Sequence, residues 1–121
     1  MLLTQETKNL KEQNKQRQKA LKETRDSYMN AKNRYDIADA DKTKSQNKLL
    51  KNKTVMSKLN KTQQKALKAG KTVSTKGITD PKVLKWIQDY NEKVKKSADL
   101  SKKLRIEQEA LDKAIPAANN D

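Results

Sequence analysis

The sequence lacks cysteine and histidine altogether, and each absence excludes a class of chemistry. Without cysteine there is no disulfide, no thiolate nucleophile and no cysteine-ligated metal. Without histidine, the chain also lacks the most common general base and metal ligand at neutral pH. We therefore expect a protein that is not an enzyme and that holds no metal and no cofactor.

Glycine and proline are nearly absent as well, with two of each in 121 residues. Sheets and sandwiches need turn residues every 8–12 positions, and so few glycines and prolines cannot supply them. Phenylalanine is missing, aromatic residues make up 3% of the chain and hydrophobic residues 32%, so a broad globular core is not expected. Abundant Lys, Gln, Glu, Leu and Ala instead predict long helices that pack along a narrow seam.

Long hydrophobic runs are also missing: none approaches the length of a signal-peptide core or a membrane span. The sequence thus predicts a protein of the cytoplasm or of the inside of a viral particle, without signal peptide or transmembrane segment. Binding to a membrane surface is disfavoured, because interfacial helices carry Trp and Phe on their apolar face. Residues 1–68 contain neither.

Positive charge is what the sequence has in excess, with 29 Lys and Arg against 15 Asp and Glu. Most of the net charge of +14 comes from residues 42–79, here called the basic block, which contain eleven lysines and no acid. The segments before and after it carry only +2 and +1. Without acidic residues three or four positions away, these lysines cannot be neutralised by ion pairs along a helix.

The segment "AGKTVSTKGITDP" (69–81) contains both glycines and the first proline, and it predicts a break between two helices. Gly70 is placed to end one helix, and Asp80 and Pro81 to begin the next as N-cap and first helical residue. We expect an all-α fold, an antiparallel two-helix coiled-coil hairpin. Its first helix runs from about Thr4 to Leu67, and its second from Pro81 to Ile115.

A heptad frame predicts how the two helices align. In the expected register Asn52 faces Ser97 and Leu49 faces Ser101, so the middle of the seam is polar. The first helix is longer than the second, and its N-terminal arm extends beyond the hairpin. The predicted divisions are the arm at 1–34, the hairpin at 35–115 with its basic elbow at 69–80, and a tail at 116–121.

The arm carries an apolar stripe that we expect to contact another copy of the chain or a larger protein assembly. Its residues are Leu3, Leu10, Leu21 and Tyr28. Trp86 and Tyr90 stand one turn apart in "KWIQDY" and have two readings. They either hold the elbow end of the hairpin together or dock a partner, since Trp is enriched at interface hot spots.

The basic block predicts a surface for nucleic acid or another polyanion, bound without sequence specificity. Lys44, Lys51, Lys58 and Lys65 share one heptad position and would form a column about 32 Å long on a continuous helix. The block has no interleaved aromatic residues, so base stacking is not expected. The full set of predicted contacts is Lys44, Lys48, Lys51, Lys58, Lys61, Lys65, Lys68, Lys71 and Lys76.

Two other interpretations of the lysines stay open: an acidic protein partner, or a solvated face that keeps the protein soluble. The leading function is a structural or assembly protein, such as an internal component of a viral particle. The alternative is a coiled-coil adaptor or stalk that docks on a larger protein machine. The asymmetric hairpin and "KGIT" (76–79) resemble, in architecture and these few loop residues alone, the small stalk proteins of bacterial export ATPases.

Two further motifs do not support a small-molecule site. "AGKT" (69–72) resembles the end of a phosphate-binding P-loop, but Lys65 stands where that motif needs its first glycine. Asp36, Asp39 and Asp41 are closely spaced, but they lack the pattern and the turn glycine of a calcium loop. We therefore expect no small-molecule substrate.

Overall fold

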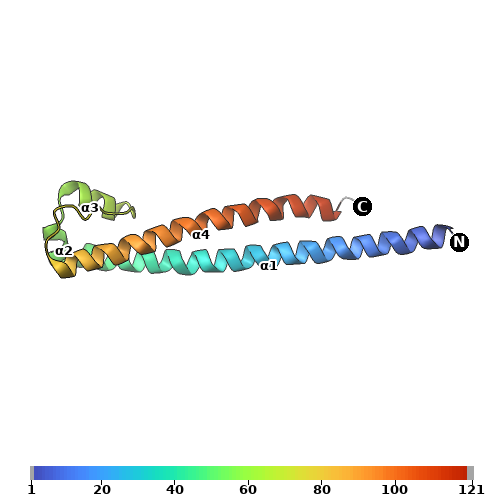
Figure 1. Ribbon diagram of the computed structural model, residues 1–121, viewed down its shortest axis with the longest axis horizontal. Helices are drawn as coiled ribbons and strands as arrows, with labels where there is room; N and C mark the ends of the chain where they lie inside the picture. Colours follow the sequence, from blue (N-terminus) through green and yellow to red (C-terminus); the bar gives the residue numbers. More distant parts are fainter. Residues whose placement is uncertain (1, 120–121) are drawn as a thin grey trace. The chain divides into compact units, whose positions relative to one another are not determined.

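The computed structural model describes residues 2–119, and every regular element in that range is an α-helix. The helices are α1 (Leu2–Lys51), α2 (Lys53–Lys58), α3 (Lys61–Lys68) and α4 (Pro81–Asn119). α1 packs against α4, and the two run antiparallel (Figure 1). The predicted all-α fold, with a long N-terminal helix against the C-terminal one, is confirmed. In the described part of the chain, no helix combines the length and apolarity needed to cross a membrane.

The chain forms two compact units, and both long helices contribute to each. One unit comprises residues 34–101 and contains α2, α3 and the elbow. The other combines the described residues 2–33 and 102–119. In this second unit the side chains of residues 4–20 are exposed, whereas Leu21 and Ala118 are buried.

The first helix ends sixteen residues earlier than predicted, at Lys51 rather than Leu67. Asn52 leaves the helix with an extended backbone (φ −87°, ψ 105°), and its side-chain oxygen accepts the amide of Val55 at 3.2 Å to cap α2. Asn60 repeats the device for α3, where it forms a reciprocal capping box with Gln63. Such caps satisfy amides that a new helix leaves unpaired, and they favour a restart over continuation.

The predicted register of α1 against α4 is also wrong. The Ser97 hydroxyl lies 3.4 Å from Asp39, not opposite Asn52, and Lys93 pairs with Asp41 at 3.5 Å. The helices are therefore displaced by three to four turns from the expected alignment. The displacement follows from the early end of α1, because residues 52–80 fold upon themselves and do not lengthen the hairpin.

Residues 52–80 form what we call the knob, a small folded segment between the end of α1 and the start of α4 (Figure 1). Its core joins apolar side chains of α2, α3 and the elbow to those of both long helices. The buried members are Leu49, Val55, Leu59, Leu67, Val73, Ile78, Val83, Ile87 and Tyr90. The elbow is thus part of a packed core and not a simple connection.

The predicted helix signals at the two ends of the elbow are confirmed. Gly70 has a φ of 71°, its amide donates to Leu67 O at 3.1 Å, and the Lys71 amide donates to Ala66 O at 2.9 Å. This pair of bonds is a Schellman motif, which needs a left-handed residue where glycine carries no Cβ penalty. Asp80 caps α4 by accepting the amides of Lys82 and Val83.

Pro116 does not end the second helix, because α4 continues to Asn119. Proline removes one backbone hydrogen bond and crowds the preceding turn. Here that cost falls close to the C-terminal end of a 39-residue helix. The predicted end at Ile115 is therefore wrong.

Candidate functional site

Gln63 holds the knob together from within, and its side chain is only 5% exposed. Its Oε1 accepts the amide of Asn60 at 2.8 Å. Its Nε2 donates to the carbonyls of Ser74 and Lys76, at 2.8 and 3.1 Å. One side chain thereby fixes the start of α3 and the elbow, where the backbone has no regular partner of its own.

Two further glutamines satisfy the carbonyl ends of the short helices. Gln46 of α1 donates to the carbonyls of Leu67 and Lys68, at 2.8 and 3.2 Å. Gln64 donates to those of Met56 and Leu59, at 3.0 and 3.1 Å. The last carbonyls of any helix lack intrahelical donors, so these amides stabilise helices that are too short to persist alone.

α4 fixes the elbow through two neighbouring residues. Asn91 makes a two-way contact with Val73, accepting its amide at 2.7 Å and donating to its carbonyl at 2.8 Å. The Tyr90 hydroxyl donates to Lys71 O at 2.9 Å, and the Tyr90 side chain is fully buried. Of the two interpretations of Tyr90, the structure supports the first: the residue is part of the core that holds the elbow end of the hairpin together.

The burial of Tyr90 predicts a pH effect on stability. Burial raises the pKa of the Tyr90 hydroxyl above its ordinary value of 10. Because the folded state holds the proton more tightly, this stability is complete below pH about 10 and is lost as pH rises through the folded pKa. In urea unfolding at neutral pH, Tyr90→Phe should lose about 1 kcal/mol through the missing hydrogen bond. The difference from the unmodified protein should shrink above pH about 10; a constant difference would contradict the prediction.

The nine lysines predicted to contact a polyanion all lie on the surface of the unit formed by residues 34–101. Every lysine of the basic block except Lys42 is exposed, and Lys42 pairs with Asp39 at 3.4 Å. Within the described chain, none of the nine predicted contact lysines is in an ion pair. Their charge is therefore uncompensated by neighbours, and any compensation has to come from salt ions or from a partner.

The predicted lysine column is interrupted. Lys44 and Lys51 lie on α1, Lys58 on α2 and Lys65 on α3, so the four do not share one helix. The helix breaks at Asn52 and Asn60, where the backbone is extended, distribute the later lysines over the knob instead of along one continuous helix. The lysines are thus exposed, as the prediction of a binding surface requires, but their arrangement differs from the predicted column.

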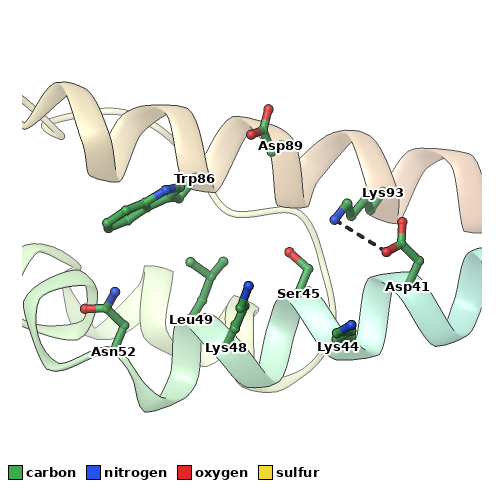
Figure 2. Close-up of a pocket in the computed structure, with 9 residues that line it drawn as sticks. All are labelled: Asp41, Lys44, Ser45, Lys48, Leu49, Asn52, Trp86, Asp89 and Lys93. Carbon is green, nitrogen blue, oxygen red and sulfur yellow. Dashed lines mark ion pairs between the residues drawn. The ribbon is translucent and has the colours of Figure 1, made fainter.

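A groove with a volume of about 470 Å³ lies between α1 and α4 beside the knob. Trp86 lies at one end, near Leu49 and Asn52, and the Asp41–Lys93 ion pair lies at the other (Figure 2). Lys44 and Lys48 line it from α1. The same two lysines border a second, more open hollow with Thr43, Asn47 and Lys51.

The residues predicted to dock a partner differ in how far their side chains are exposed. Trp86 is 41% exposed in the groove, and Leu10 is 64% exposed. Tyr28 is half-buried, and Leu21 is buried within the chain, which leaves little of its side chain for a partner. The side chain of Leu3 lies outside the described residues.

Sequence reasoning missed the amide side chains that build the knob. The sequence predicts no role for Gln46, Gln63, Gln64 or Asn91. The signal that was available is "NKTQ" at 60–63, since Asn followed three residues later by Gln indicates a capping box. No known protein family, curated protein or solved structure matches this chain.

Proposed function

We propose that this chain is a non-enzymatic structural or assembly protein that binds nucleic acid or another polyanion without reading its sequence. The single observation that carries the proposal is the exposed, unpaired lysine set on the knob and on the last turns of α1. Lysine suits this task, because it acts as a point charge on phosphate, whereas base reading favours the fork of arginine. Packing inside a viral particle or another nucleoprotein assembly would make use of such a surface.

The elbow adds groups that contact phosphate well. Lys71 and Lys76 are exposed there beside the hydroxyl residues Thr72 and Ser74. Lysines, hydroxyls and backbone amides are among the groups that contact nucleic acid backbones, and such contacts carry no direct sequence information. Two finer predictions belong to the same proposal: that α1 and α4 interlock as a coiled coil, and that Leu10 contacts another copy or a larger assembly.

The test is a titration of labelled duplex DNA, followed by fluorescence anisotropy over a range of salt concentrations. With six to ten phosphate contacts, affinity should fall by about 10³- to 10⁵-fold between roughly 50 and 200 mM salt. Replacing Lys58, Lys61, Lys65 and Lys68 by glutamine should reduce the slope of log K against log salt by about 3 to 4.

The matched control replaces four exposed lysines of α4, namely Lys95, Lys96, Lys102 and Lys103, by glutamine. This variant loses the same net charge but leaves the knob intact, so its salt slope should change much less. Equal slopes in the two variants would mean that total charge, and not the knob, governs binding. No binding at low salt would refute the proposal and favour the adaptor that docks on a protein machine.

A further inference from the structure

We infer that the groove between α1 and α4 accepts a base of single-stranded nucleic acid, which stacks on Trp86 while flanking phosphates contact Lys44 and Lys48. This inference rests on the proposed function and narrows it to a ligand class and a site. It also reverses the expectation that base stacking is absent, because the fold brings an aromatic side chain from outside the basic block next to its lysines.

Trp86 has the exposure that stacking requires. Its side chain is 41% exposed, in contrast to Ile87 and Tyr90 on the same helix, which are completely buried. It lies in a groove with Leu49, a buried apolar residue, and with the amide of Asn52 (Figure 2). An aromatic face with apolar and amide neighbours suits a planar base, which has a π-face and polar edges.

Lys44 and Lys48 supply the charge for the backbone of the same strand. They are exposed, line the groove, and stand four residues apart on α1, a rise of about 6 Å. That spacing is comparable to the separation of successive phosphates in an extended single strand. The second hollow, with Thr43, Asn47 and Lys51, borders the same two lysines along these turns of α1.

The acidic residues of the groove do not oppose this path. The Asp41 carboxylate is held by Lys93 at 3.5 Å. Asp89 is exposed, and its carboxylate is turned away from α1 (Figure 2). A duplex would not offer a free base face to Trp86, so the groove should favour single strands over duplexes of equal length.

The experiment uses the intact chain, in which Trp86 is the only tryptophan and hence a reporter for this site alone. At low salt, oligothymidylate should quench its fluorescence on binding. Inorganic polyphosphate of similar charge should compete with labelled DNA in anisotropy and yet leave the fluorescence nearly unchanged. Binding of both ligands with equal fluorescence changes, or with none, would overturn the inference and leave the proposed function standing. Failure of both to bind would overturn the two together.

Variants give a second, independent readout. Trp86→Ala should weaken single-strand binding about 5- to 150-fold and duplex binding less than about twofold. Trp86→Phe, which keeps an aromatic face, should recover much of the loss. Circular dichroism checks that both variants fold. A uniform loss for single strands and duplexes in a folded Trp86→Ala variant would contradict stacking.

Discussion

Replacing Leu67 with alanine is expected to unfold the knob, with a loss of about 3 to 5 kcal/mol in its free energy of unfolding. Leu67 is completely buried among residues from α2, the elbow and α4. The knob is short and its core is small, so few neighbouring side chains can move into the cavity that the substitution leaves. A loss of this size is a large part of the stability of a small domain.

Hydrogen exchange measures this effect locally. The amides of Gly70 and Lys71, which bond to the end of α3, should exchange much faster in Leu67→Ala than in the unmodified protein. Ile106→Ala is the matched control, because three carbon atoms are likewise removed, here from a side chain that is 64% exposed. That variant should stay within about 0.5 kcal/mol of the unmodified protein. If both substitutions had the same small effect, the knob would not have the core described.

Replacing Gln63 with alanine is the second large effect, at about 2 to 4 kcal/mol. The substitution removes three hydrogen bonds, to Asn60 N, Ser74 O and Lys76 O, from a site that is nearly inaccessible to water. Buried polar groups that lose their partners cost more than the bonds themselves contributed. The start of α3 and the elbow should therefore loosen together.

Urea unfolding and exchange of the amides around Asn60 and Lys76 test this prediction. Gln88→Ala, on the exposed face of α4, is the control and should be nearly neutral. A Gln63→Glu variant keeps an oxygen that can accept from Asn60 N but loses both donors to the elbow. Its unfolding free energy should also fall, with the elbow affected more than the helix start. Full stability of Gln63→Glu would show that the bonds to Ser74 and Lys76 contribute little.

Much of the helical content could be predicted from the sequence, because it depends on local preferences. Almost no glycine or proline interrupts residues 2–51 or 81–115, and helix formation there needs only good helix formers. Gly70, Asp80 and Pro81 act within a few residues of themselves, so their predicted roles as helix stop, N-cap and helix start were correct.

The errors lie where a local choice is decided by distant contacts. Residues 52–68 have the composition of a continuing helix, and the caps at Asn52 and Asn60 compete with that preference. The caps prevail because the interrupted chain buries Val55, Leu59 and Leu67 against Val83 and Ile87, which a straight helix could not do. The register of α1 on α4 changes with the position of that break.

The exposure of the basic lysines was determined by the sequence itself, because so many charges without acidic partners cannot be buried at acceptable cost. Only the tertiary structure decided where those charges are presented and what lies beside them. Trp86 and Lys44 are far apart along the chain, and packing of α4 on α1 places both in one groove. Charge and helix propensity are properties of neighbouring residues, whereas a binding groove depends on a register that the folded core selects.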